Sequence, residues 1–187
     1  MPGMRLLDLA EKAVKHALKI GADEAEAYIS RPRSIIVDVE RGDISSESVR
    51  EIGGIGTRVI TGGSVGFSHI DKLEEKRLEE AVERAYRISR ASIKDPYAAL
   101  PHPKRPARVY GICDKRVADL QVEECVELSS TILEAALNYD RRVSVDLGRF
   151  EATTSENAIA NSNGISASED ETLISVSIMA LAKGNGE

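Results

Sequence analysis

Residues 53–67, GGIGTRVITGGSVGF, include six glycines and still alternate in the manner of paired β-strands. The period-two pattern continues to Ile70. The pair Gly62-Gly63 stands where a two-residue hairpin turn would lie, because glycine adopts positive φ at little steric cost. Glycines inside strands mark bulges, bends or the close approach of another backbone. We therefore expect a strongly bent hairpin against which another segment packs closely.

A dinucleotide-binding loop is the main alternative for this segment. The pattern Gly54-x-Gly56 lacks the third glycine of that fingerprint, since Val59 stands at its position. A strand follows the glycines where the fingerprint requires a helix, so no helix N-terminus is available to receive a phosphate. These departures favour the hairpin over the phosphate loop.

Arg58 is the candidate substrate contact within this hairpin. An arginine that projects from a glycine-flanked strand presents a planar fork of donors to a carboxylate, including the C-terminus of a peptide. The alternative is an ion pair with a neighbouring acidic side chain, which is the commoner arrangement for an exposed arginine. The sequence alone leaves both open.

The composition predicts a globular, cytoplasmic protein. The 187 residues are 42% hydrophobic and 30% charged, with a net charge of −6 and 4% aromatic residues. A negative net charge and few aromatic rings argue against direct nucleic-acid binding, which uses basic stripes and stacked rings. No apolar run reaches the roughly 18 residues of a membrane span, so no membrane partner is expected. Cys113 and Cys125 lie in apolar patterns and are expected to be buried free thiols.

The first half of the chain predicts a helix followed by a meander of strands. Apolar residues at three- and four-residue steps predict a helix over residues 4–20, which Gly21 ends. Arg31-Pro32-Arg33 separates the first two strands, and a turn at residues 41–43 follows them. Period-two alternation places five strands at residues 24–30, 34–40, 44–52, 55–61 and 65–70.

The second half of the chain begins after a proline-rich segment. Before that segment, Asp71 and Glu74 resemble an N-cap and its capping-box partner for a helix over residues 73–92. Its predicted apolar stripe includes Ile88. The proline-rich segment, residues 94–108, is expected to be a linker or surface loop. A short strand at residues 109–113, a helix at 120–138 and a strand set at 142–182 then follow.

A second glycine turn is predicted within the last strand set. The run Asn161-Ser162-Asn163-Gly164 has the residue types of a tight turn, with Asn163-Gly164 as its strongest hairpin signature. These four residues are interpreted as structural turn residues, together with Gly62 and Gly63.

These elements predict an α+β fold: a curved antiparallel sheet with about three helices packed mainly on one face. A shift of 121 positions superimposes several apolar and glycine positions of the two halves, which suggests an internal duplication. The expected organisation is a first half at residues 1–92, a proline-rich connection at 93–108 and a second half at 109–187.

The sequence offers no pattern for a catalytic or metal site. His16, His69 and His102 have no further ligands at metal-binding spacing; the best local match, His69-x-Asp71, supplies too few for zinc. No Gly-x-Ser-x-Gly nucleophile motif occurs. We therefore name no catalytic residue and no metal ligand in this chain.

Three passages of the chain resemble one known family. They are the glycine–arginine block GIGTRVITGGSVGF, the strand at residues 23–28, DEAEAY, and the Asn161–Gly164 turn. Together, and in this order, they resemble the TldD/PmbA family, once called modulators of DNA gyrase. The likeness spans most of the chain and is slightly closer to the PmbA type, which lacks the metal.

The resemblance implies the non-catalytic N-terminal domain of a zinc-metalloprotease system. The catalytic half would lie downstream of Glu187, on a helix of the His-Glu-x-x-x-His kind, so this chain alone is expected to be inactive and without a cofactor. Zinc is expected in that further domain or in the partner subunit. The domain would wall a cavity for a peptide or unfolded-protein substrate and contact a second TldD/PmbA-type subunit, in a homo- or heterodimer. A stand-alone binding or assembly module with no proteolytic role is the alternative.

Overall fold

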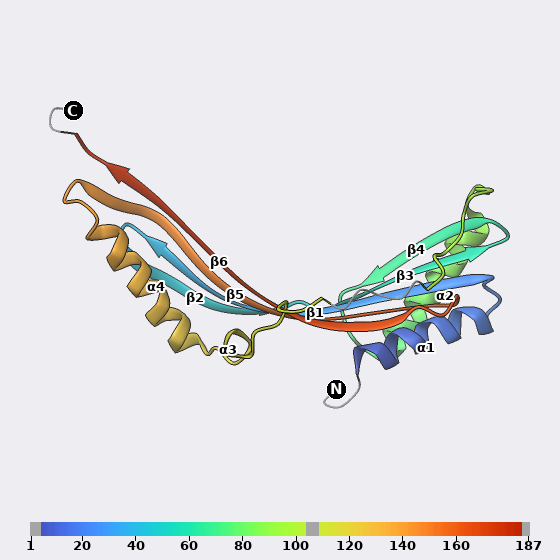
Figure 1. Cartoon of the computed structure of the whole chain (residues 1–187). Coiled ribbons are helices and arrows are strands. Elements are labelled where there is room, and N and C mark those ends of the chain that lie inside the picture. The colour runs from blue at the N-terminus through green and yellow to red at the C-terminus, as the bar shows by residue number, and fades with distance from the viewer. Residues whose placement is uncertain (1–4, 104–108, 185–187) are drawn as a thin grey trace. The chain divides into compact units, whose positions relative to one another are not determined.

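The computed structural model describes residues 5–103 and 109–184, which form six strands and four helices (Figure 1). The α+β class with an antiparallel sheet is confirmed. Three helices are long and α3 has four residues. In chain order the elements are α1 (Leu6–Lys19), β1 (Glu24–Glu40), β2 (Asp43–Glu51), β3 (Gly54–Thr61), β4 (Ser64–Ile70), α2 (Glu75–Ala91), α3 (Lys115–Ala118), α4 (Val122–Leu137), β5 (Val143–Asn161) and β6 (Ser166–Ala182).

The chain divides into two compact units, each assembled from separated stretches of sequence. Unit 1 comprises the described residues of 1–31, 52–109 and 156–170; unit 2 comprises those of 32–51, 110–155 and 171–187. The long strands β1, β5 and β6 therefore contribute to both units. Each unit therefore contains residues from both predicted halves of the sequence. The internal duplication stays a prediction.

In unit 1, α1 and α2 cover one face of the strands. The pairing order is β4-β3-β1-β5-β6. The amphipathic stripes of the two helices bury small and branched side chains against alternate residues of β1, β3 and β5, as their period-three and period-four spacing requires. This core includes Leu9, Ala13, Ala27, Ile55, Leu78, Val82 and Ala160.

In unit 2, α4 packs against β1 and β5. Here β2 pairs with β1, and β5 and β6 follow on the other side of β1. Gln121 begins α4 with a capping box: its backbone N–H donates to the Glu124 carboxylate at 2.9 Å. The buried core gathers Ile35, Val37, Cys125, Phe150 and Ala152.

Strand β1 is one continuous strand of 17 residues, so the predicted break at residues 31–33 is wrong. Pairing with β3 ends at Ser30, and pairing with β2 begins at Arg33. Pro32 lies between these two ladders, where its missing amide hydrogen costs no hydrogen bond with either strand. The predicted meander, in which each strand would pair with the next one along the chain, is also wrong. Strands β2 and β3 do not pair with each other; each pairs with β1.

The two hairpin turns of the first half lie between β1 and β2 and between β3 and β4. Arg41 and Gly42 have φ values of 54° and 83°, and Gly62 and Gly63 have 59° and 79°. Two positive φ values in a two-residue loop match the type I′ turn that suits the twist of paired strands.

Several helix boundaries differ from the sequence predictions. Helix α2 begins at Glu75 after Glu74, with no side-chain cap, so Asp71 is not its N-cap. Residues 109–113 form no strand, and Cys113 is exposed, whereas Cys125 is buried as expected. Met4 and residues 104–108 lie outside the described residues; residues 94–103 of the proline-rich segment form no helix or strand, apart from a bridge of Lys94 to Ser64.

Candidate functional site on the helix-free face of unit 1

The β3–β4 hairpin divides its side chains between two faces of the sheet. Ile55, Thr57 and Val59 are buried on the face that carries α1 and α2. Strand alternation places Arg58 and Phe67 on the opposite face, where neither described helix of unit 1 packs. Leu100 lies over this face at one end, where its N–H donates to Glu24 Oε2 at 2.8 Å. Arg58 and Phe67 are also direct partners in the β3–β4 register. The strand pattern thus exposes a charged and an aromatic side chain together.

Arg58 forms an ion pair with Glu26 on the neighbouring strand. Its Nη2 donates to Glu26 Oε1 at 2.7 Å, and the two residues face each other in the β1–β3 register. The Arg58 side chain is 44% exposed, whereas that of Glu26 is 13% exposed. The carboxylate therefore holds the guanidinium in place while the Arg58 side chain stays partly exposed to solvent. The ion pair that the sequence left as the alternative is formed.

Two exposed aromatic rings border this pair. Phe67, 57% exposed, lies so close to Gly56 that a β-carbon on Gly56 would come 3.4 Å from the ring. His69 stacks beside Phe67, with ring centroids 6.5 Å apart. Tyr28, 48% exposed, lies opposite Gly56 in the β1–β3 register. Phe67, His69 and Tyr28 therefore form an aromatic surface next to Arg58.

A small hollow continues this face towards β5 and β6. The Tyr28 hydroxyl donates to Asn157 Oδ1 at 3.0 Å, and both residues line a cavity of about 160 Å³ with Ile159, Ala167 and Glu169. The mixture of aromatic, amide and carboxylate groups suits a peptide-like ligand with both apolar and polar parts.

The turn between β5 and β6 is built around the side chain of Asn161. Its Oδ1 accepts hydrogen bonds from the backbone N–H groups of Asn163 at 3.1 Å and Ile165 at 2.9 Å. Gly164 has a φ of 98°, while Asn163 is outside the positive-φ region. The connection is thus four residues long, not the two-residue Asn163-Gly164 turn expected, because Asn161 supplies the hydrogen bonds that fold it.

The same turn ties two other segments of unit 1 together. Four hydrogen bonds reach from its side chains to the start of β1 and to residues 100–101. Ser162 Oγ accepts from the Ala25 N–H (3.1 Å), Asn161 Nδ2 donates to Pro101 O (2.9 Å), and Asn163 Nδ2 donates to Leu100 O (2.9 Å) and Glu24 Oε2 (3.1 Å). The polar side chains of the turn are therefore engaged in holding the fold.

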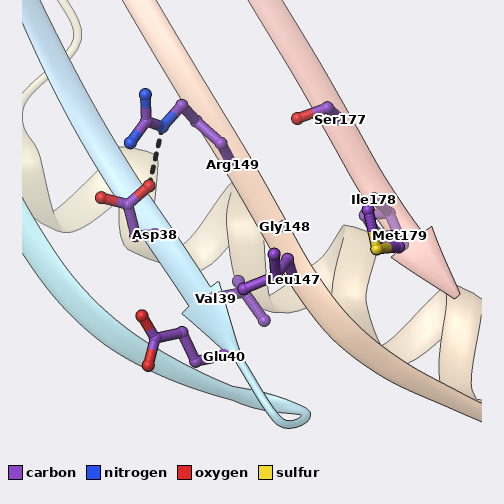
Figure 2. Close-up of a pocket in the computed structure, with 9 residues that line it drawn as sticks. All are labelled: Asp38, Val39, Glu40, Leu147, Gly148, Arg149, Ser177, Ile178 and Met179. Atoms are coloured by element: carbon purple, nitrogen blue, oxygen red, sulfur yellow. Dashed lines mark hydrogen bonds and ion pairs between the residues drawn. The ribbon is translucent and has the colours of Figure 1, made fainter.

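Unit 2 has its own groove on β1, β5 and β6, with a volume of about 550 Å³. Figure 2 shows Arg149 of β5 reaching towards Asp38 of β1, with Leu147 and Met179 on neighbouring strands and Glu40 further along β1. Arg149 Nε donates to Asp38 Oδ1 at 2.7 Å. This hydrogen bond holds the pKa of Asp38 below its ordinary value and raises the pKa of Arg149. The groove therefore keeps a charged pair beside apolar side chains.

The described residues do not fit a zinc site. Within residues 5–103 and 109–184, no three His, Cys, Asp or Glu side chains gather as ligands. His16 lies 3.8 Å from the Glu83 carboxylate, and His69 stacks on Phe67. Burial raises the pKa of the Cys125 thiol. We therefore assign no chemical step to a metal in this chain.

Sequence reasoning named Arg58 but missed the residues around it. Glu26 and Tyr28 come from β1, Phe67 comes from β4, and Asn157 comes from β5, 129 positions after Tyr28. The alternation of residues 24–28 would have placed Glu26 and Tyr28 on one face. Only the register between strands brings Arg58 opposite Glu26, and that register could not be read from period-two pattern alone.

The comparisons with known proteins identify the family. A family model described as PmbA/TldA metallopeptidase domain 1 matches residues 25–89, and one described as the central domain of PmbA/TldA metallopeptidases matches residues 115–187. The chain belongs to the TldD/PmbA family. The two matches lie on either side of the proline-rich segment, residues 94–108.

Two curated relatives of this TldD/PmbA chain cover nearly all of it. An uncharacterized protein of Methanocaldococcus jannaschii is 28% identical over 174 residues, which are 93% of this chain and 39% of that protein. Metalloprotease PmbA of Escherichia coli is 24% identical, over 96% of this chain and 41% of its own length. The chain therefore spans about two fifths of the length of these relatives.

Solved structures of the family share the fold. TldE from Thermococcus kodakarensis superimposes with a TM-score of 0.86 at 21% identity, over 96% of this chain and 40% of that one. A Thermotoga maritima protein, named as a candidate modulator of a DNA gyrase, gives a TM-score of 0.81 at 18% identity, over 97% and 41%. At these identities the likeness shows the fold alone.

No helix among the described residues is long and apolar enough to cross a membrane.

Proposed function

We propose that this chain is the non-catalytic N-terminal part of a subunit in a TldD/PmbA-type zinc-metalloprotease system, slightly closer to the PmbA type. In this proposal, the helix-free face of unit 1 forms a wall against which a peptide or an unfolded chain lies. The protein acts in the cytoplasm beside a second TldD/PmbA-type subunit. The catalytic zinc belongs to a further domain or to that subunit, because the described residues offer no ligand set for it.

The observation that carries the proposal is the pairing of Arg58 with a half-buried carboxylate on an otherwise open, aromatic face. Glu26 fixes the guanidinium through one hydrogen bond. A guanidinium has five N–H donors in a planar fork, so donors remain for a second carboxylate. Phe67 and Tyr28 offer apolar contact area on the same face. These groups together suit the C-terminal carboxylate of a peptide and the side chain beside it.

A binding experiment with two forms of one peptide tests this role. An N-terminally fluorescein-labelled hexapeptide is titrated with the protein, once with a free C-terminal carboxylate and once as the C-terminal amide, and fluorescence anisotropy is measured. We expect the free carboxylate to bind at least about tenfold more tightly, since a charge-assisted hydrogen bond contributes about 1.5–3 kcal/mol. Arg58→Met should abolish this preference.

Arg31→Met is the matched control. The Arg31 side chain is 42% exposed, close to the 44% of Arg58, and it too pairs with a carboxylate, that of Glu156. The control variant should keep the preference for the free carboxylate. Equal affinity of the native protein for both peptide forms would rule out carboxylate recognition at Arg58.

A further inference from the structure

An unpaired acidic side chain lies in the hollow beside Tyr28. Glu169 of β6 lines this hollow together with Tyr28, Ile159 and Ala167. In the described part of the chain, the Glu169 carboxylate has no hydrogen-bond or ion-pair partner. A carboxylate that is left unpaired in a hollow of about 160 Å³ is open to a cationic group of a ligand.

Strand alternation places Glu169 on the same face of the sheet as Arg58. The Ser166 hydroxyl donates to the Glu11 carboxylate of α1 at 2.9 Å, so the even-numbered residues of this part of β6 point towards the helices. Glu169 has the opposite parity and therefore points to the helix-free face. The hollow and the Arg58 guanidinium are thus open to one and the same ligand.

The walls of the hollow match the two parts of a lysine or arginine side chain. Ile159 and Ala167 offer apolar contact to a methylene stem, which long basic side chains bury while their charged ends stay solvated. The hydrogen bond from its hydroxyl to Asn157 holds the Tyr28 ring in place, and the face of such a ring attracts a cation. Glu169 then receives the charged end. One carboxylate and one amide oxygen are too few ligands for a metal ion, so the cation is an organic one.

The charges on this face of unit 1 favour the same chemistry. By alternation, strands β1, β3, β5 and β6 present three carboxylates there, those of Glu24, Glu26 and Glu169, against one arginine, Arg58. Glu24 and Glu26 already accept hydrogen bonds within the fold. Glu169 is therefore the carboxylate that is left for a basic group of a ligand.

A ligand that binds and leaves explains this composition better than a permanent cover does. Permanent interfaces are more apolar than surfaces that bind and release a partner. A carboxylate that is buried permanently without a partner is also costly. A face with a free carboxylate and an exposed ion pair stays compatible with water when it is empty, which is the behaviour expected of a substrate surface.

We infer that the hollow binds a lysine or arginine side chain of the same peptide whose C-terminal carboxylate binds Arg58. The inference rests on the proposed function and adds its substrate class, namely peptides with a basic residue a few positions before a free C-terminus. Arg58 of β3 and Glu169 of β6 are three strands apart in the pairing order, about 14 Å at the usual strand spacing. An extended chain covers about 3.3 Å per residue. With the reach of the side chains, the basic residue lies about three positions before the last one.

A pair of peptides that differ in one ammonium group tests the inference. Fluorescein-labelled hexapeptides with a free C-terminus carry either lysine or norleucine at position 3, and fluorescence anisotropy gives Kd for each. Norleucine keeps the aliphatic stem of lysine without the charge. The native protein should bind the lysine peptide at least about fivefold more tightly. The same exchange at position 5, which is too close to the carboxylate to reach the hollow, should have little effect.

Three variants assign the preference to the hollow. Glu169→Gln should remove the preference for lysine and keep the preference for a free carboxylate. Asp170→Asn is the matched control, because it removes a carboxylate from the next residue of β6, which points to the opposite face. It should keep both preferences, which separates binding in the hollow from a general attraction of basic peptides to an acidic protein. Arg58→Met should keep the lysine preference and lose the carboxylate preference.

Equal affinity of the native protein for the lysine and norleucine peptides would overturn the inference. A lysine preference that Glu169→Gln leaves intact, or that Asp170→Asn removes to the same extent, would overturn it as well. In these outcomes a preference for the free carboxylate would leave the proposed function standing. A lysine preference that depends on Glu169 without any carboxylate preference would instead contradict the role of Arg58, and a native protein that binds neither peptide would contradict both.

Discussion

Gly66 of β4 lies directly against the backbone of α2 at Ala85: a β-carbon on residue 66 would come 2.0 Å from the Ala85 carbonyl oxygen. The same β-carbon would lie 2.4 Å from the backbone nitrogen of Ser89. The helix and the strand thus touch through main-chain atoms. Gly66 is the point at which the glycine-rich hairpin admits another segment, as its composition predicts.

Replacing Gly66 by alanine should strongly destabilise the protein. The added methyl group meets backbone atoms, which cannot rotate away, so α2 must shift from the sheet and the core between them must open. We expect the free energy of unfolding to fall by about 3 kcal/mol or more. Urea denaturation followed by circular dichroism measures it.

Gly184→Ala is the control for this change. No heavy atom lies within 4 Å of the position that its β-carbon would take. The variant should unfold at the native urea concentration. If Gly66→Ala behaved like Gly184→Ala, the close packing of α2 on β4 would be wrong.

The contact between Gly66 and α2 also explains why the sequence analysis predicted the wrong buried residue near the end of α2. An apolar stripe at helical spacing favours Ile88 as a core residue, yet Ile88 is 40% exposed and Ser89 is fully buried. The Ser89 hydroxyl donates to Tyr86 O at 2.8 Å, and its oxygen lies within hydrogen-bond distance, 3.0 Å, of the Thr61 hydroxyl. A small side chain is needed where the helix meets Gly66, and hydrophobicity alone does not carry that information.

Other differences between prediction and structure have local causes. Alternation located β2, β3 and β4 and a strand set over the residues of β5 and β6, but it divided β1 into two strands. It could not join residues 24–30 to 34–40, because Pro32 is a strand breaker in sequence, whereas in the structure neither the β3 ladder nor the β2 ladder of β1 includes Pro32. Arg58 was found from its glycine-flanked strand, whereas its partner Glu26 depends on the register between β1 and β3.

The Gly164 position yields a second stability prediction. Its φ of 98° lies in a region that residues other than glycine rarely adopt. A β-carbon at this position would not clash, since its nearest neighbour, Pro103 Cγ, would be 3.7 Å away. Gly164→Val should therefore cost more than about 1 kcal/mol through backbone strain and not through a clash. The melting temperature, measured by differential scanning calorimetry, should fall accordingly.

Asn163→Val separates backbone strain from the loss of the turn's hydrogen bonds. Asn163 has no positive φ, but its side chain binds Leu100 O and Glu24. That variant should also lose stability, through the loss of these two hydrogen bonds and without a change of backbone strain. For Gly164, an unchanged melting temperature would contradict the strained turn geometry.

The ion pair of Asp38 and Arg149 predicts how the stability of the protein depends on pH. The hydrogen bond from Arg149 lowers the pKa of Asp38 in the folded protein. A lowered folded-state pKa means that the unfolded chain takes up the proton first as the pH falls. The contribution of Asp38 is therefore fully present above its unfolded pKa, near pH 4, and disappears as the pH falls through the lower folded value.

Urea unfolding at pH 6 and pH 3 checks this sign. Every variant will lose stability at pH 3 through its other carboxylates, so the comparison is between losses. Asp38→Asn should lose less free energy of unfolding than the native protein between the two pH values, because it has no carboxylate to protonate at this site. In an Arg149→Met background the pKa of Asp38 returns towards its ordinary value, and Asp38→Asn should then make a smaller difference to the loss, because only the weaker effects of Ser46 and Arg50 remain. A difference as large as the one seen with Arg149 present would contradict the leading role of Arg149.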